Sequence, residues 1–228
     1  MTAIPRPAST VVLMDSNSQI YLTKRPKTMK FMGGFFVFPG GAVEQGDHLS
    51  DGMIRTCGER NPSVNLSYYT AAARELLEEA GVLLCCKENG SAVLLPEETI
   101  TEYRRLLVSG QITFWDMLDK EDLYLNLDNL RYFGNLVTPK PNKIRFDTRF
   151  FAANLPYGQS PCPSSQEIDE AYWLTAEKAL TAYHAGEISL APPTILSLLT
   201  IIDHLHGAPL EMNETLLEKI LSESKFRL

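Results

Sequence analysis

The chain has 228 residues, of which 44% are apolar and 21% charged, so it can bury a full core as a globular protein does. Its net charge of −7 argues against a general nucleic-acid binder or a membrane-surface protein. No apolar run approaches the roughly 18 residues of a membrane span and no signal peptide is recognisable, so the sequence predicts a cytoplasmic protein.

The first 80 residues predict short strands and turns that lead into one helix. Turn residues at 15–18 separate the first two apolar runs, which predicts a β-hairpin. A basic loop is expected at 24–30, and residues 48–66 show little periodicity and predict a second loop. The strands are expected at 11–14, 20–23 and 35–38, and the helix at about 67–80.

The predicted helix at 67–80 carries three carboxylates on one face. Glu75, Glu78 and Glu79 stand at i, i+3 and i+4, so each repulsive pair costs roughly 0.2–0.5 kcal/mol. Arg74 can offset part of this repulsion by reaching Glu78. A hard divalent cation such as Mg²⁺ would offset it better, because it takes carboxylate oxygens and pairs with substrate phosphates. The alternative is a solvated acidic face with no function.

The opposite face of the same helix is predicted to pack in the hydrophobic core. Ala73, Leu76, Leu77 and Ala80 follow helical spacing. Gly81 stands where a left-handed C-terminal cap would fall, so the helix is expected to end there.

The rest of the chain predicts further helices and strands. Residues 96–121 read as two helices separated at Gly110, the second around 112–118. Strands are expected at 130–136, 144–153 and 172–174, a loop at 155–165, and helices at 175–185, 193–206 and 213–224. Together these elements predict one α/β domain over residues 1–228, with a mixed sheet against the carboxylate-bearing helix. The additions to it are a loop insertion at 48–66, a helical insertion at 96–121 and C-terminal helices at 192–224.

The cysteines and histidines show no metal-site spacing. Cys85 and Cys86 follow an apolar run and are predicted to be buried thiols rather than ligands or a disulfide. His204 and His206 are two apart in a helical pattern, so they fall on different faces and are expected at or near the surface.

Two segments resemble the halves of a Nudix box. Residues 38–47 read FPGGAVEQGD and residues 74–82 read RELLEEAGV. The family pattern is Gly, five residues, Glu, seven residues, then Arg-Glu-apolar-x-Glu-Glu-x-Gly-apolar. Here Gly41 is followed by five residues and Asp47, where the family has Glu. Residues 48–73 then number 26 where the family has seven, so 19 are inserted within the box.

The resemblance implies an α/β/α sandwich and hydrolysis of a pyrophosphate bond by water attack on phosphorus. It implies Mg²⁺ or Mn²⁺ as cofactor, because a divalent ion neutralises the diphosphate and activates water. Glu78 and Glu79 would be the main metal ligands. Glu75 would be a further ligand or the base for the attacking water, and these two roles stay open. Gly40 would offer a backbone carbonyl to the metal.

Two further roles follow from the resemblance. Arg74 would hold a carboxylate of the box in place, either Glu78 or Asp47; the alternative is a surface ion pair of little worth. Nudix enzymes often recruit one more carboxylate from a later segment, and Glu167 and Glu170 are the candidates here. The alternative for each is an acidic turn on the surface.

The substrate is indicated by segments around the box. Residues 22–26 and 34–41 resemble the segment before the box in coenzyme A diphosphatases. The insertion and the strand at 145–151 resemble the peroxisomal branch of those enzymes, and a bacterial-type relative would fit as well. Basic side chains that could meet substrate phosphates are Lys24, Arg25, Lys27 and Lys30, although a solvated surface charge is the better interpretation of any single one of them.

Three hypotheses stay open at this point. The first is a metal-dependent pyrophosphohydrolase of coenzyme A or acyl-coenzyme A. The second is a Nudix hydrolase of ADP-ribose, a dinucleotide or a nucleoside triphosphate. The third is a binding module with this fold but without turnover, which Asp47 and the split box would favour and the intact carboxylates disfavour. The helical additions could wall a pocket or form a homodimer interface, and the sequence does not decide between these.

Overall fold

The computed structural model describes residues 3–29, 32–49, 54–140, 142–164 and 168–213, together with 215, 216 and 220. Its centre is a mixed sheet with strand order β10-β2-β1-β9-β8, in which β3 pairs with β2 and β4 pairs with β1. The strands of this sheet are β1 (Arg6–Met14), β2 (Ile20–Lys24), β3 (Phe36–Val37), β4 (Gly40–Ala42), β8 (Arg131–Val137), β9 (Phe146–Asn154) and β10 (Glu170–Leu174).

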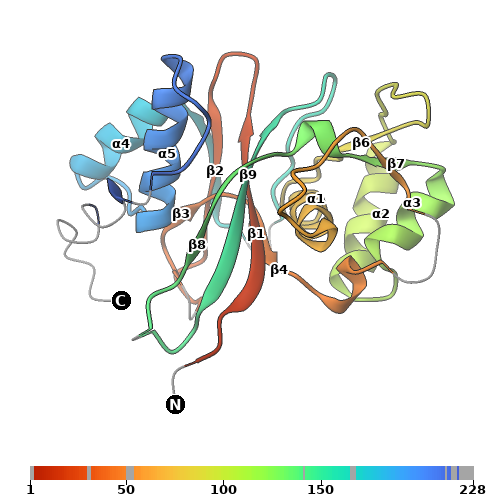
Figure 1. Ribbon diagram of the computed structural model, residues 1–228, viewed down its shortest axis with the longest axis horizontal. Helices are drawn as coiled ribbons and strands as arrows, with labels where there is room; N and C mark the ends of the chain where they lie inside the picture. Colours follow the sequence, from red (N-terminus) through yellow and green to blue (C-terminus); the bar gives the residue numbers. More distant parts are fainter. Residues whose placement is uncertain are drawn as a thin grey trace.

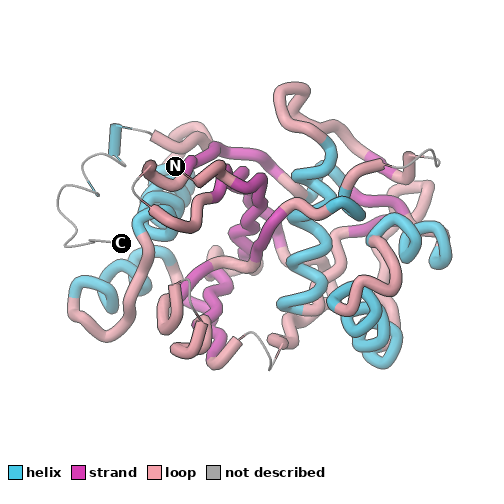
Figure 2. The backbone as a smooth tube through the Cα atoms, turned by 90° about the horizontal axis from the view of Figure 1, so that it is seen from below, coloured by secondary structure: helices cyan, strands magenta, loops and turns pink. Residues whose placement is uncertain are grey.

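Helices cover the sheet on both faces (Figure 1). On one side lie α4 (Ala176–His184) and α5 (Pro192–Leu205). On the other side lies α1 (Leu66–Ala80), with α2 (Glu97–Val108) and α3 (Phe114–Glu121) beyond it. Figure 2 shows the same layers from below, with the magenta strands between cyan helices. The predicted α/β/α sandwich with extra helices is confirmed.

Strand β1 supplies both cores because successive side chains of a strand point to opposite faces. Val11 and Leu13 pack with the α1 layer, whereas Val12 packs with the layer formed by α4 and α5. Since the second half of β1 is central in the sheet and covered on both faces, residues 11–14 form a continuous apolar run rather than an alternating one.

Helix α1 begins and ends where the sequence predicts. Asn65 caps its start, because the side chain of Asn65 accepts a hydrogen bond from the amide of Ser67. Gly81 adopts the left-handed conformation at its end, with φ of 69°, and donates its N–H to the carbonyl of Leu77. This fixes the register of the carboxylate-bearing turn relative to the sheet.

Several strand expectations were wrong in their extent. Strand β1 starts at Arg6 rather than at residue 11, because its first half pairs in parallel with β9 and antiparallel with β4. Residues Gly40–Ala42, where no strand was expected, form β4 and pair with β1. Both differences arise from partners far away in the sequence.

A second, smaller sheet lies beside α2 and α3 and was not predicted. It has the order β5-β7-β6, formed by Thr56–Cys57, Tyr124–Asn126 and Cys85–Cys86. A disulfide joins Cys57 to Cys86 across 29 positions, so the prediction that Cys86 is a buried thiol was wrong, whereas Cys85 is a buried thiol. The predicted loop at 48–66 is therefore anchored to the segment after α1.

The remaining additions agree in part with the sequence. The helical insertion at 96–121 contains α2 and α3, separated around Gly110 as expected. Most of the helix expected at 213–224 lies outside the described residues. Of the helices that the structure describes, none is both long and apolar enough to cross a membrane.

Candidate active site

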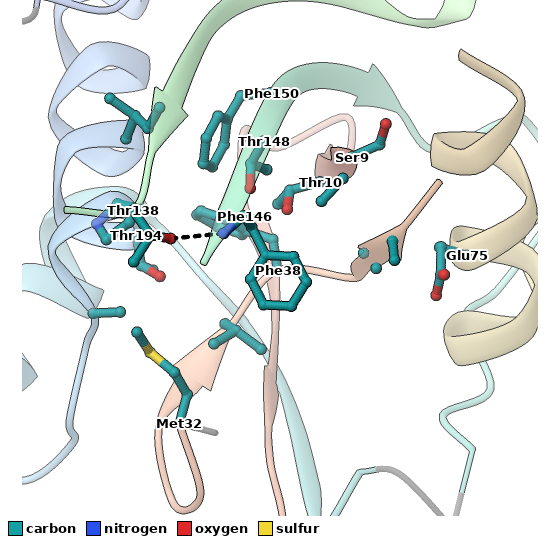
Figure 3. A pocket seen from close by; sticks show the side chains of 18 of the residues that line it. Ser9, Thr10, Met32, Phe38, Glu75, Thr138, Phe146, Thr148, Phe150 and Thr194 are labelled. Atoms are coloured by element: carbon teal, nitrogen blue, oxygen red, sulfur yellow. Dashed lines mark hydrogen bonds between the residues drawn. The ribbon is translucent and has the colours of Figure 1, made fainter. Parts of the chain in front are cut away.

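A cavity of about 400 Å³ opens between α1, the strands and the start of α5. Figure 3 shows Glu75 projecting from α1 on one side, Thr138 and Thr194 on the opposite side, and Phe38 and Phe146 between them. Glu79, Gly40 and Gly41 line the same end as Glu75. The cavity thus brings both halves of the split motif to one wall.

Arg74 is buried and lies among the carboxylates of this wall. Its Nε lies 2.8 Å from Oδ1 of Asp47 and its Nη2 lies 2.9 Å from Oδ2, which makes a bidentate pair. Its Nη1 lies 3.0 Å from Oε1 of Glu75 and 3.1 Å from Oε2 of Glu78. A single guanidinium therefore orders three carboxylates, and Nη2 also donates to the carbonyl of Ala42 at 2.9 Å.

Asp47 reaches Arg74 from a short 3₁₀ turn, Gln45–Asp47. The carboxylate of Asp47 also accepts the backbone N–H of Glu44 at 2.8 Å, which closes the turn. The indole N–H of Trp115, on α3, donates to the backbone carbonyl of Asp47 at 3.4 Å. The helical insertion thus contributes to placing the first half of the motif.

The two glycines of β4 allow close approaches, Gly41 to a carboxylate and Gly40 to the backbone of β1. The backbone N–H of Gly40 donates to Oε2 of Glu79 at 3.2 Å. A Cβ atom on Gly41 would lie 2.3 Å from Oε1 of Glu75, so the carboxylate occupies the space that any side chain at position 41 would need. A Cβ atom on Gly40 would instead lie 2.3 Å from the backbone carbonyl oxygen of Ser9.

The electrostatics of the wall follow from burial. Burial raises the pKa of Glu75 to about 8; the Arg74 charge lowers it and the Glu78 charge raises it further. Burial likewise raises the pKa of Glu78 to about 7, against the lowering effect of Arg74. Burial lowers the pKa of Arg74, but its neighbours Asp47, Glu75 and Glu78 more than reverse this and leave that pKa raised. Without a bound cation, both carboxyl groups therefore keep their protons to a higher pH than an exposed glutamate does.

The donor chemistry of this wall fits a hard divalent cation, which prefers carboxylate oxygens. The fit is one of chemistry, because Arg74 lies between Glu75 and Glu78 and makes the contacts that a cation would make. Within the described ranges, no three His, Cys, Asp or Glu side chains are grouped closely enough to hold a metal ion. The guanidinium contacts one oxygen of each carboxylate, Oε1 of Glu75 and Oε2 of Glu78, so the other oxygen of each is the one that a cation would approach.

Of the two later carboxylates proposed as ligands, the structure describes Glu170, which does not lie at this wall. Glu170 lies exposed on β10 and pairs with Lys24 on β2, Oε1 to Nζ at 2.5 Å, because the two residues stand opposite each other in the ladder. Neither residue lines the cavity. Glu167 lies outside the described residues.

Of the basic candidates, Arg25 alone lines the cavity. Its Nε is buried and has no hydrogen-bond partner among the described residues. Lys27 is exposed and lies outside the lining, and Lys30 lies outside the described residues. Arg25 is therefore the basic residue best placed for a ligand.

Sequence reasoning missed the far end of the cavity. Phe146, Thr148 and Phe150 line it from β9, and their period of two in the sequence is the signal that they share one face. The start of α5, with Pro192 and Pro193, closes the cavity opposite. The placement of this helix beside the cavity depends on the tertiary fold, so no local sequence pattern predicts it.

Comparison with known proteins gives consistent matches. Residues 55–201 match the family described as the NUDT19 Nudix domain. The acyl-coenzyme A diphosphatase NUDT19 of Xenopus laevis is 24% identical over 237 residues, covering 86% of this chain and 62% of that protein. The crystal structure of a NUDIX hydrolase from Alicyclobacillus acidocaldarius superposes with a TM-score of 0.78 at 27% identity, covering 93% of this chain and all of that one. The chain spans about three fifths of the length of the curated relatives it matches.

Proposed function

The chain belongs to the Nudix hydrolase family, and from this membership we propose that it hydrolyses the diphosphate of coenzyme A or of an acyl-coenzyme A in a metal-dependent reaction. The observation that carries the substrate proposal is the two-ended cavity. One end is acidic and glycine-lined, and the other end is lined mainly by apolar side chains, with the threonines Thr138, Thr148 and Thr194 among them. Coenzyme A has the same division, with phosphates at one end and a pantetheine arm at the other.

The acidic end supports the chemistry. Nudix hydrolases generally use divalent metal ions. When bound, such an ion would neutralise the diphosphate and lower the pKa of a coordinated water. Glu78 and Glu79 would hold it, together with the carbonyl of Gly40. Glu75 would be a further ligand or would accept the proton of the attacking water.

Arg74 and Asp47 are proposed to position the carboxylates at the acidic end of the cavity. Through Nη1, Arg74 restrains Glu75 and Glu78, while Asp47 fixes the plane of the guanidinium by two hydrogen bonds. A restrained carboxylate loses less conformational freedom when it takes up a cation or a proton. Glu75 and Glu79 line the cavity, which favours these two for contact with the substrate side of the site.

Arg25 is proposed to bind a substrate phosphate. Its Nε is a buried donor, and an unsatisfied buried donor is costly, so an anionic oxygen there would be favourable. Arg6 lines the same cavity and is exposed, which suits a second phosphate contact near its mouth. Lys24 is less suited, because its ammonium is already paired with Glu170.

The apolar end is proposed to receive the pantetheine arm and its acyl group. Leu136, Phe146 and Phe150 form one wall and Pro192 lies opposite. Burial of each methylene group against such a surface contributes about 0.8 kcal/mol. The preference for one acyl-chain length over another would then depend on how many methylene groups this end of the cavity can bury.

Product analysis tests the proposal. Wild-type protein would be incubated with Mg²⁺ or Mn²⁺ and, in separate reactions, coenzyme A, acetyl-coenzyme A, ADP-ribose, NADH and nucleoside triphosphates, with Glu79→Gln as the control. Release of 3′,5′-ADP and 4′-phosphopantetheine by wild type alone is the expected result. Cleavage of ADP-ribose or NADH alone would retain the chemistry and overturn the substrate. Absence of any cleavage would favour a binding module.

A further inference from the structure

The last turn of α1 is held from outside the motif by Arg104 of α2. Its Nε donates to the backbone carbonyl of Glu78 at 3.0 Å, and its Nη2 donates to the carbonyl of Glu79 at 3.2 Å. These are the two residues whose side chains are proposed as the main metal ligands. Arg104 thus acts on their backbone, whereas Arg74 and Gly40 donate hydrogen bonds to their carboxylates.

The end of a helix needs such donors, because its last four carbonyls have no partner within the helix. Here backbone N–H groups from a distant segment donate to some of these carbonyls. The N–H of Cys162 donates to the carbonyl of Ala80 at 2.8 Å, and the N–H of Ser164 donates to that of Glu79 at 2.9 Å. Arg104 adds the only formal charge among these described donors, at the end of the helix where the dipole is negative.

Arg104 is itself fixed by its place on α2. The neighbouring side chains Tyr103 and Leu107 are buried in the core that also contains α1. Its guanidinium also packs at the helix end, where a Cβ atom on Gly81 would lie 3.3 Å from Nη1. The planar fork of a guanidinium can donate to two successive carbonyls at once, which a lysine ammonium does less well.

We propose that Arg104 is a positioning residue for the reaction, which holds the backbone of Glu78 and Glu79 so that their carboxylates are presented together to the cation. This inference rests on the proposed function for its catalytic consequence. It gives the helical insertion at 96–121 a role in the active site. The insertion would then support the last turn of the catalytic helix through Arg104.

Three variants test this role, and Arg105→Gln is the matched control. Arg105 is the next residue on α2, is exposed, and pairs only with exposed Glu102 among the described residues, at 2.7 Å. Arg104→Gln removes the charge, and Arg104→Lys keeps the charge but not the fork. Each protein would be checked for folding by circular dichroism and thermal unfolding.

The first readout is Mn²⁺ affinity, measured by the electron paramagnetic resonance signal of unbound Mn²⁺. The second is hydrogen exchange of the backbone amides in the last turn of α1, without metal or substrate. We expect Arg104→Gln to weaken Mn²⁺ binding and to lower kcat, each by about tenfold, which corresponds to about 1.4 kcal/mol. KM should change less than kcat, exchange in the last turn should accelerate, and Arg105→Gln should match wild type.

The conservative variant keeps the test decisive if Arg104→Gln does not fold. Arg104→Lys should retain a smaller defect in kcat and in Mn²⁺ affinity than Arg104→Gln. Wild-type Mn²⁺ affinity, exchange and kcat in a folded Arg104→Gln or Arg104→Lys would overturn the inference. Failure of the proposed function has a different signature, in which wild type itself neither binds Mn²⁺ nor cleaves any substrate while the exchange readout still responds to Arg104.

Discussion

Asp47 and Arg74 form a buried bidentate ion pair although 27 positions separate them in the sequence. Asp47 is shorter by one methylene than the glutamate usual at this place in the family. The 3₁₀ turn Gln45–Asp47 brings its backbone close enough for both oxygens to reach the guanidinium. The pair therefore brings the two halves of the split motif into contact. The hydrogen bonds of Arg74 to Glu75 and Glu78 in turn restrain these two carboxylates.

Loss of this pair should destabilise the protein strongly. Asp47→Asn leaves the buried Arg74 charge without its main partner, and breaking one side of a buried pair costs about 3–5 kcal/mol. Urea unfolding should show this decrease in the free energy of unfolding. Glu170→Gln, which breaks the exposed pair with Lys24, is the control and should change stability little. Equal effects of the two substitutions would contradict the role given to Asp47.

Removing a carboxylate of the catalytic helix should affect turnover rather than folding. Glu78→Gln and Glu79→Gln should each lower kcat by about a hundredfold, which is roughly 3 kcal/mol of barrier. The melting temperature without metal should stay close to that of wild type, because each substitution also removes like-charge repulsion within the helix. Glu97→Gln, on the exposed first turn of α2, is the control. Near-wild-type kcat in both variants would rule out the proposed ligand set.

The two glycines of β4 should respond differently to alanine. At Gly41 the new methyl group meets the flexible end of Glu75, so Gly41→Ala should displace that carboxylate and lower kcat with little loss of stability. At Gly40 it meets the backbone of Ser9 and Thr10, so Gly40→Ala should lower the melting temperature as well. Parallel melting curves and steady-state rates for the two variants check this. The reverse pattern would mean that Glu75 is not held against Gly41.

The stability of the metal-free protein should depend on pH through Glu75. Its pKa rises from 4.5 to about 8 on folding because of burial, so the folded state binds more protons between these values. The free energy of unfolding should therefore fall as the pH rises from about 5 to about 8. Glu75→Gln should flatten this slope, which urea unfolding at several pH values would measure. An identical slope in wild type and variant would show that Glu75 is not buried as described.

The disulfide between Cys57 and Cys86 should contribute to stability under oxidising conditions. A cross-link that closes a loop of about 30 residues is worth about 3–4 kcal/mol on the chain-entropy account. Cys57→Ser should lower the free energy of unfolding in oxidising buffer and leave it unchanged in the presence of a reductant. Peptide mapping without reduction should recover the two cysteines in one linked fragment.

The sequence predicted best what local spacing determines. Helix α1, its end at Gly81 and its buried face follow from the 3.6-residue pattern and from one glycine. The extension of β1 to Arg6 and the existence of β4 depend on pairing with distant strands, which no local window contains. In the site, Glu75 and Glu79 could be paired with Gly40 and Gly41 because both segments carry a recognisable motif.

Other parts of the site could not be predicted for a similar reason. Glu170 was a candidate ligand, yet the ladder between β2 and β10 sets it opposite Lys24, and register is a property of the sheet rather than of either strand. The contact of Arg104 with the end of α1 depends on how α2 packs, and in the sequence Arg104 looks no different from its exposed neighbour Arg105.

The closeness of Asp47 and Arg74 also explains why the stretch between them can be so long. For a flexible connection, lengthening from seven to 26 residues raises the entropy cost of closure by only about 1 kcal/mol. The ends of that connection meet at one buried ion pair whether it is short or long. The entropy of closure therefore opposes an insertion there only weakly, and the motif is a place where a chain can gain new surface at small cost in stability.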